Sequence, residues 1–280
     1  MEYIYGVIGD PIAHSMSPAI HNDAFQVENI AARYHHFHVL SENLPDAIKG
    51  LKAVGVSGFN VTVPHKTAII PLLDEVDDLA RAIGAVNTVI YKNGRYIGYN
   101  TDGEGFYRSL VERIGIELTS KKTLIIGAGG AARAIYFTLV KEGVSNVDIA
   151  NRTLARAEWL IADCPYPKQS SALTMSEAEQ SLAEYDLIIQ TTSSGMSPDT
   201  NAMPLDSKRL RQDAFVSDVI YNPLETQLLI QAKANGAEIQ NGVDMLVNQA
   251  ALAFQLWTGI FPDTQRMKEI VLNKLGGSTC

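Results

Sequence analysis

Cysteine and a surplus of basic residues are both missing from this chain. Its 280 residues include only Cys164 and Cys280, which are too few for a disulfide framework and lack metal-ligand spacing, so we expect two free thiols. Acidic residues outnumber basic ones by 31 to 23, for a formal charge of −8. This balance argues against a surface that neutralises nucleic-acid phosphates or binds anionic lipid. An anionic small molecule would need a local basic pocket.

Long hydrophobic runs are also missing. No apolar stretch approaches the roughly 20 residues that a membrane-spanning helix needs, and the start of the sequence lacks the basic stretch of a signal peptide. We therefore expect a cytoplasmic protein that binds neither membrane nor nucleic acid. Hydrophobic residues make up 46% of the chain and charged residues 19%, as is typical of globular proteins. The length exceeds that of a usual single domain and predicts two.

Segments with strand and helix character alternate over the first hundred residues, as in a largely parallel sheet with crossover helices. Helices are expected from about Pro18 and over residues 44–54. Asn93-Gly94 is a strong hairpin signal. The expected strands lie at residues 3–8, 34–39, 59–63, 87–91 and 96–99.

The alternation restarts at residue 123 and predicts a second, doubly wound unit. The chain turns helical after Gly242, first with one apolar face and then over residues 263–275. The fold class is therefore α/β with two domains: a mostly parallel open sheet with helices, residues 1–101 plus 243–280, and a Rossmann-type domain, residues 102–242. The strands expected in the second domain lie at residues 123–126, 147–150, 187–190, 215–219 and 238–240.

A glycine-rich turn follows the first strand of the second domain. Residues 127–132 fit the pattern G-x-G-x-x-A, in which Gly127 permits a tight turn and Gly129 lets the backbone approach a pyrophosphate. The small Ala132 allows the helix to pack closely on the strand, and amides at the helix N-terminus would face phosphates. Glycines also occur in ordinary strand–helix turns, so this pattern alone leaves nucleotide binding open.

The end of the next strand distinguishes two nicotinamide cofactors. An NAD enzyme places a carboxylate there to hold the ribose 2′-hydroxyl, whereas this sequence has Asn151, Arg152 and Thr153, followed by Arg156. Guanidinium groups offer charge-assisted bonds to a 2′-phosphate. The sequence therefore favours NADP over NAD. The alternative is that Thr153 caps the next helix and the arginines are solvated.

Polar residues gather around the third expected strand of the first domain. Asn60 and Thr62 share one face of that strand and Val61 and Val63 the other. Taken alone, this pattern would suit an edge strand facing solvent. Lys66 lies just past the carboxyl end of the strand, where open parallel sheets bind ligands, so this region is a candidate substrate site.

Together with residues 10–18, 85–88, 100–103 and 242–250, these motifs resemble the shikimate dehydrogenase family over essentially the full chain. The resemblance implies an NADP-dependent oxidoreductase that reversibly reduces 3-dehydroshikimate to shikimate in chorismate and aromatic amino-acid biosynthesis. It also suggests that the C-terminal helices fold back on the first domain. One departure stands out: family members often have Asn before Thr or Ala where this chain has Gln190-Thr191.

The resemblance also implies the residues of the site. Lys66 and Asp102 would be catalytic. Substrate contacts would come from Ser15, Ser17, Asn60, Thr62, Lys66, Asn87, Asp102, Tyr221 and Gln249. Cofactor contacts would come from Asp78, Gly127, Ala128, Gly129, Gly130, Ala131, Asn151, Arg152, Thr153, Arg156, Val219 and Gly242.

An ammonium beside a carboxylate is favoured in its charged form, so Lys66 is expected to donate to the developing alkoxide while Asp102 orients it and accepts from a substrate hydroxyl. Simpler structural interpretations exist for single residues: Ser17 before Pro18 could cap a helix, Asp102 could cap the next one, and Lys66 could be solvated. Two other functions stay open. One is a quinate/shikimate dehydrogenase of looser specificity, and the other a non-catalytic NADP-binding regulator on the same fold.

Three histidines raise the possibility of a metal site. His36 and His38 share a strand face and His35 points away, but the sequence shows no nearby cysteine or close carboxylate to complete a tetrahedral set. We therefore expect no metal. His65 could be taken for the acid or base, yet its side chain is expected to point away from the substrate. The chain is expected to act as a monomer or homodimer.

Overall fold

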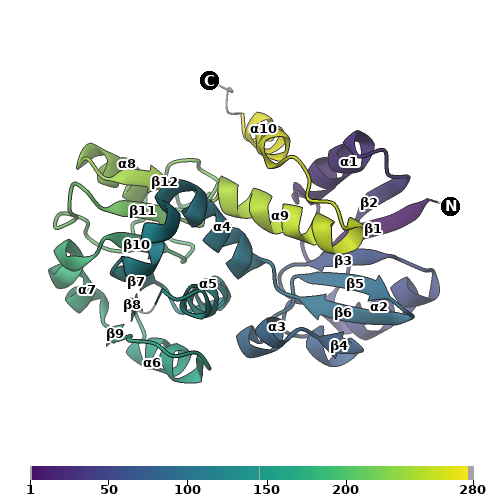
Figure 1. Cartoon of the computed structure of the whole chain (residues 1–280), viewed down its shortest axis with the longest axis horizontal. Coiled ribbons are helices and arrows are strands. Elements are labelled where there is room, and N and C mark those ends of the chain that lie inside the picture. Colours follow the sequence, from purple (N-terminus) through teal and green to yellow (C-terminus); the bar gives the residue numbers. More distant parts are fainter. Residues whose placement is uncertain (1, 145, 277–280) are drawn as a thin grey trace. The chain divides into compact units, whose positions relative to one another are not determined.

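The computed structural model describes residues 2–144 and 146–276 (Figure 1). The chain forms two compact units, Met1–Gly105 with Val247–Cys280, and Phe106–Leu246. Cys164 is buried with a free thiol, as predicted, and Cys280 lies outside the described residues. No helix within the described ranges is long and apolar enough to cross a membrane.

The sheet of the first unit has the strand order β2-β1-β3-β5-β6-β4. β1 pairs in parallel with β2 and β3, and β4 with β6, whereas β5 runs antiparallel to β3 and β6. The expected hairpin therefore borders the parallel part of the sheet (Figure 1). The strands are β1 Tyr3–Gly9, β2 Ala32–His38, β3 Gly58–Val61, β4 Glu75–Val76, β5 Thr88–Lys92 and β6 Arg95–Tyr99.

The hairpin turn between β5 and β6 has the backbone that its sequence predicts. Asn93 has φ 52° and Gly94 φ 78°, and positive φ at both central residues is what a type I′ turn requires. Around the sheet lie α1 Ser17–Val27, α2 Leu44–Ala53, α3 Asp78–Ile83, α9 Val243–Thr258 and α10 Thr264–Lys274, with 3-10 turns at Ser41–Asn43 and Ile70–Leu72.

The C-terminal helices pack on the first unit, as predicted. The Trp257 indole Nε1 donates to the Val89 carbonyl at 3.0 Å, and Arg266 donates to both carboxylate oxygens of Asp23 in α1 at 2.6 and 2.8 Å. On α9, Val247, Ala250, Ala251 and Phe254 are buried. The apolar stripe of the sequence thus packs against the sheet of the first unit.

The sheet of the second unit is parallel throughout, in the order β12-β11-β10-β7-β8-β9. Outward from β7 the chain first builds one side of the sheet and then returns to build the other, which is the strand order of dinucleotide-binding domains. The strands are β7 Thr123–Ile126, β8 Val147–Ala150, β9 Ala172–Leu173, β10 Leu187–Gln190, β11 Phe215–Asp218 and β12 Glu238–Gln240. The helices are α4 Asp102–Ile114, α5 Gly130–Lys141, α6 Leu154–Asp163, α7 Met175–Ser181 and α8 Gln227–Ala234, with 3-10 turns at Gly115–Ser120 and Leu182–Glu184.

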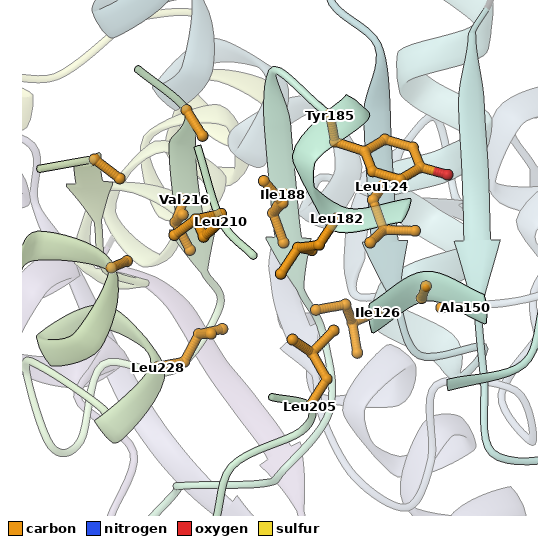
Figure 2. Close-up of a cluster of buried hydrophobic side chains, with 14 of the residues drawn as sticks. Leu124, Ile126, Ala150, Leu182, Tyr185, Ile188, Leu205, Leu210, Val216 and Leu228 are labelled. Atoms are coloured by element: carbon orange, nitrogen blue, oxygen red, sulfur yellow. The ribbon is translucent and has the colours of Figure 1, made fainter. Parts of the chain in front are cut away.

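β7, β8, β10 and β11 are buried along their whole length, as in parallel sheets that helices cover on both faces. Figure 2 shows a cluster of buried hydrophobic side chains in this unit, in which strand residues meet leucines from the helices and loops that cover them. Each fully buried side chain of this size stabilises the fold by about 1.5–3 kcal/mol relative to exposure. The carboxyl edge of the sheet is therefore a firm support for the loops that follow β7, β8, β10 and β11. The labelled residues are Leu124, Ile126, Ala150, Leu182, Tyr185, Ile188, Leu205, Leu210, Val216 and Leu228.

Candidate active site

Lys66 and Asp102 form an ion pair in the first unit. The Lys66 Nζ lies 2.6 Å from the Asp102 Oδ2, and the two side chains are 31% and 17% exposed. The Asn87 Nδ2 donates to the other carboxylate oxygen, Oδ1, at 2.8 Å. Both oxygens of Asp102 are therefore engaged, and the Lys66 ammonium keeps hydrogens for a ligand. The structure brings together these three residues from positions far apart in the sequence.

Two threonines that the sequence analysis missed fix the Asn87 amide. The Asn87 Oδ1 accepts from the Thr101 backbone N at 2.8 Å and from the Thr88 hydroxyl at 2.9 Å. Asn87 and both threonines are buried. Because its oxygen faces these donors, the amide must turn its nitrogen toward Asp102. The only sequence signal was that each threonine stands next to a predicted site residue, Asn87 or Asp102.

Asn60 is buried on β3 and held at both ends of its amide. Its Nδ2 donates to the Asn87 carbonyl at 3.2 Å and to the Thr88 hydroxyl at 3.0 Å, while its Oδ1 accepts from the Tyr34 hydroxyl at 2.7 Å. Both amide hydrogens are used in this way. The second lone pair of Oδ1 is what Asn60 can offer to a ligand hydroxyl.

The strand that carries Asn60 ends earlier than predicted. β3 stops at Val61, and His65 N bonds to the Thr62 carbonyl at 2.9 Å in a turn. Val63 was expected to share the buried face of Val61 but is 68% exposed, because the strand alternation ends at that turn. Within the turn, His65 is buried and its Nε2 lies 2.6 Å from the Val39 carbonyl.

Ser15 and Ser17 lie where the chain passes from β1 into α1. The Ser17 N donates to the Ser15 Oγ at 3.3 Å. The helix begins at Ser17 and its N-cap is Met16, with no side-chain capping bond to the described residues of α1. The interpretation of Ser17 as a helix cap is therefore wrong by one residue, and its side chain instead contacts the Tyr34 hydroxyl.

Three further predicted residues occupy different elements. Gln249 is half-buried on α9, beside Gly105, where an added Cβ would lie 2.5 Å from the Gln249 N. Asp78 is exposed as the first residue of α3, which Asp77 caps by accepting from two backbone amides. Tyr221 belongs to the second unit, and burial raises the pKa of its hydroxyl.

The glycine turn of the second unit has the backbone that its motif predicts. Gly127 has φ 112°, and an added Cβ would lie 2.6 Å from the Thr191 Oγ1. Gly129 is the N-cap of α5, which begins at Gly130. An added Cβ at Gly129 or at Gly130 would meet no described atom within 4 Å, whereas Ala132 is fully buried. The turn is therefore tight on one side and open on the other, where amides can reach a phosphate.

The predicted 2′-phosphate residues follow β8. The Asn151 Nδ2 donates to the Thr153 carbonyl at 2.8 Å. Thr153 is the N-cap of α6, but its side chain makes no capping bond within the described part of that helix, and Arg152 and Arg156 are exposed. A cavity of about 680 Å³ lies beside this segment, lined by Ala128, Gly129, Gly130, Arg133, Arg156, Trp159, Leu160, Ala162 and Asp163.

Gln190, the residue that departs from the family pattern, forms hydrogen bonds with the loop that follows it. It is fully buried at the end of β10. Its Nε2 donates to the Thr192 Oγ1 at 2.9 Å and to the Ser194 carbonyl at 3.1 Å, and its Oε1 accepts from the Thr192 N at 3.0 Å. The side chain thus folds forward onto its own loop. This loop also borders the glycine turn through the contact between Thr191 and Gly127.

Gly242 and Val219, both predicted at the cofactor site, are in backbone contact. An added Cβ at Gly242 would lie 2.1 Å from the Val219 carbonyl oxygen, and the Gly242 N donates to the Ile220 carbonyl at 2.9 Å. No side chain fits in this space. Gly242 therefore fixes the segment after β11 against the start of α9.

Replacing Gly242 by alanine should lower the free energy of unfolding by at least about 1–3 kcal/mol, because backbone must shift to admit the methyl group. Urea unfolding would measure it. Gly50→Ala is the matched control: Gly50 lies inside α2 with no described atom within 4 Å of an added Cβ, so this change should stabilise by about 0.5–1 kcal/mol. Equal stabilities for the two variants would contradict the close approach at Gly242.

Asp218 is a buried carboxylate that the sequence analysis did not single out. It ends β11, where its Oδ1 accepts from the Ile220 N at 2.9 Å and its Oδ2 from the Thr226 hydroxyl at 2.8 Å. Burial raises its pKa to about 6, although both hydrogen bonds act in the opposite direction. An acidic residue at the end of a strand that begins with Phe215 and Val216 was the signal available in the sequence.

The raised pKa of Asp218 should make stability depend on pH. An unfolded aspartate loses its proton near pH 3.9, whereas the folded one keeps it to about pH 6. Between these values the folded state binds more protons, so raising the pH destabilises it. Relative to Asp218→Asn, the wild-type protein should lose about 2 kcal/mol of unfolding free energy between pH 4 and pH 7. Urea unfolding at pH 4, 5, 6 and 7 would test this, and a constant difference would contradict it.

Comparison with known proteins covers nearly the whole chain. Three family models match: the shikimate dehydrogenase substrate binding domain at residues 7–89, shikimate/quinate 5-dehydrogenase at 109–223, and the shikimate 5′-dehydrogenase C-terminal domain at 242–272. A curated relative from Geobacillus sp. (strain WCH70), named shikimate dehydrogenase (NADP(+)), is 55% identical over 99% of this chain and 100% of its own length.

Solved structures agree with this result. A shikimate dehydrogenase in complex with NADP+ has 42% identity and a TM-score of 0.91, covering 98% of this chain and 96% of its own. The shikimate 5-dehydrogenase of Listeria monocytogenes, in complex with shikimate and NAD, has 34% identity and a TM-score of 0.91, covering 96% of each chain. The chain belongs to the shikimate dehydrogenase family.

Proposed function

We propose that this protein catalyses the NADPH-dependent, reversible reduction of 3-dehydroshikimate to shikimate, a step of chorismate and aromatic amino-acid biosynthesis. The observation that carries the proposal is the Lys66–Asp102 ion pair held by Asn87, on a chain whose relatives bear this activity in their names. We assign substrate binding to residues 1–101 with 243–280, and NADP binding to residues 102–242. We further propose a cytoplasmic enzyme that works as a monomer or homodimer.

The bound nicotinamide supplies the hydride, and the protein's task is to place a proton and stabilise charge. Lys66 Nζ donates its proton to the oxygen of the ketone as that oxygen becomes an alkoxide. Asp102 keeps the ammonium in place through the 2.6 Å contact, and its remaining lone pairs accept from a substrate hydroxyl. In the reverse direction Lys66 takes the proton back.

The remaining polar residues orient the substrate. We assign its carboxylate to the hydroxyls of Ser15 and Ser17, which lie together at the start of α1. Its ring hydroxyls are assigned to Asn60, Thr62, Asn87, Tyr221 and Gln249. Asn60 would accept rather than donate, since both its amide hydrogens are already used.

The cofactor residues divide by what they contact. The amides of Ala128, Gly129, Gly130 and Ala131 would face the pyrophosphate at the start of α5. Gly127 provides the tight turn, and its own amide donates to the Ala150 carbonyl at 2.8 Å. The side chains of Asn151, Arg152, Thr153 and Arg156 would hold the ribose and its 2′-phosphate. The nicotinamide end is assigned to the backbone of Val219 and Gly242, with Asp78 as a further contact.

A quinate/shikimate dehydrogenase of looser specificity is the second candidate. Its support is a family model that names both substrates and a similar structure that holds NAD with shikimate. One added hydroxyl on the ring is accepted or refused by pocket shape.

An absorbance assay separates the candidates. Purified protein is given shikimate or quinate, each with NADP+ or NAD+, and the reduced cofactor is followed. We expect the shikimate and NADP+ pair to be fastest by a wide margin. Comparable rates with quinate would favour the second candidate. Cofactor binding without turnover in any of the four would identify a non-catalytic regulator and overturn the proposed function.

A further inference from the structure

One face of β2 lies against the elements that carry the proposed substrate residues. Tyr34, His36 and His38 alternate along this strand, which pairs in parallel with β1, so their side chains share a face. Each of the three makes a polar contact with the segment 10–17 or with β3. This face is therefore a support for the candidate substrate site, although none of the three residues is itself a proposed ligand.

Tyr34 holds Asn60. The tyrosine is 2% exposed and its hydroxyl donates to the Asn60 Oδ1 at 2.7 Å. Burial raises the pKa of Tyr34 well above its ordinary value, and contacts with Ser17 and Asn60 only partly offset this effect, so the hydroxyl keeps its proton. The His21 ring stacks on Tyr34 with centroids 4.6 Å apart. The donor that faces Asn60 is thus fixed in both position and protonation.

The two histidines hold the segment that precedes α1. The His36 Nε2 lies 3.1 Å from the Ser15 carbonyl, so in the tautomer with hydrogen on Nε2 the ring donates to it. The His38 Nε2 lies 2.7 Å from the Asp10 Oδ1. This contact with Asp10 was not apparent from the sequence, and it adds one carboxylate rather than a tetrahedral set of metal ligands. The histidine pair contacts the two ends of one loop.

We propose that Tyr34 and His36 are positioning residues of the substrate site, acting through Asn60 and through the backbone of Ser15. Tyr34 saturates one lone pair of Asn60 and so directs the other toward the substrate. His36 fixes the position of the Ser15 carbonyl. It thereby also positions the Ser15 Oγ, which accepts from the Ser17 N. The inference rests on the proposed function of the same site.

Removing either contact should weaken substrate binding more than turnover, because the proton donor Lys66 lies on a different element. Tyr34→Phe keeps the ring and deletes the hydroxyl, leaving a buried acceptor unpaired. We expect the KM for shikimate to rise by about tenfold, with kcat within about twofold. His36→Ala should raise the KM by about fivefold, in keeping with the net strength of one partly exposed hydrogen bond.

The rescue variant and controls separate positioning from loss of fold. His36→Gln restores an amide Nε2 donor at similar reach and should return the KM to within about twofold of wild type, whereas His35→Gln alters the exposed neighbour on the opposite face and should change nothing. Tyr5→Phe is the control for Tyr34→Phe, because the rings of both tyrosines lie against Trp257, with centroids 5.1 and 5.9 Å from it. The KM for NADP+ should be unchanged in every variant.

The readouts are steady-state KM and kcat for shikimate and for NADP+, with thermal unfolding of each variant alongside. An unchanged shikimate KM in Tyr34→Phe and His36→Ala would overturn this inference and leave the proposed function intact. Equal rises in the KM values for shikimate and NADP+, together with a lower kcat and a lower Tm, would also overturn it, since that pattern indicates general destabilisation. Failure of the wild-type protein to oxidise shikimate would instead overturn the proposed function.

Discussion

Lys66→Ala should lower kcat for 3-dehydroshikimate reduction by about 10²- to 10³-fold, the usual cost of one donor to a developing oxyanion. The KM should change far less, because the ammonium stabilises charge that appears only as the carbonyl is reduced. The structure gives this donor a fixed place: Nζ lies 2.6 Å from Asp102, and Asn87 holds the opposite carboxylate oxygen. Steady-state kinetics with NADPH would measure both constants.

A similar ion pair elsewhere in the same unit supplies the control. The Lys52 Nζ lies 2.7 Å from the Asp74 Oδ2, with both side chains 35% exposed. Lys52→Ala removes a lysine from a comparable pair, so it should leave kcat unchanged and cost at most about 1 kcal/mol of stability. A Lys66→Ala enzyme that kept most of its turnover would remove Lys66 from the proposed mechanism.

Arg152→Asp should raise the KM for NADPH by about 100-fold while leaving the KM for NADH nearly unchanged. A hydrogen bond to a charged group contributes about 1.5–3 kcal/mol, and the new carboxylate would in addition repel the 2′-phosphate. NADH carries no 2′-phosphate and loses neither interaction. The measurement is the ratio of kcat/KM values for the two cofactors in wild type and variant.

Arg209→Asp makes the same change of charge at another exposed arginine of the second unit, one that donates to the Gln180 carbonyl at 3.4 Å. It should leave the cofactor ratio as in wild type. Raising the ionic strength should reduce the difference in the KM for NADPH between Arg152→Asp and wild type, because salt screens exposed charges. Equal losses for both cofactors in Arg152→Asp would show that Arg152 contacts something other than the 2′-phosphate.

Much of the fold follows from local patterns in the chain. Apolar runs and turn residues predicted β7, β8 and β10 with their observed bounds, and Asn93-Gly94 predicted the hairpin. These features depend on neighbours within a few residues, which periodicity can detect. The two-residue strands β4 and β9 were not predicted, since they are too short to show a period and exist only through pairing with β6 and β8.

The residues of the site likewise fall into those that local motifs predicted and those that they did not. Asn60 and Lys66 were found through one motif, which runs from β3 to just past its end, and the glycine turn through a second motif that directly follows β7. Tyr34, Thr88 and Thr101 were missed because their roles depend on partners distant in sequence: the hydroxyl of Tyr34 meets an amide 26 residues further on. The end of β3 was misplaced for a related reason, since the turn at His65 interrupts an alternation that continues in the sequence through Val63.

Gln190 and the loop that it bonds, residues 191–195, can be exchanged between proteins of this fold only together. Asparagine, one methylene shorter, could not reach the Ser194 carbonyl that the Gln190 Nε2 now contacts at 3.1 Å without drawing the loop inward, toward Gly127. A chain with asparagine at this position would therefore have to fold residues 191–195 along another path. A chimera that takes only residue 190 from another protein would not fit the loop of this one. A chimera that takes the whole segment 190–195 would keep residue and loop matched beside the glycine turn.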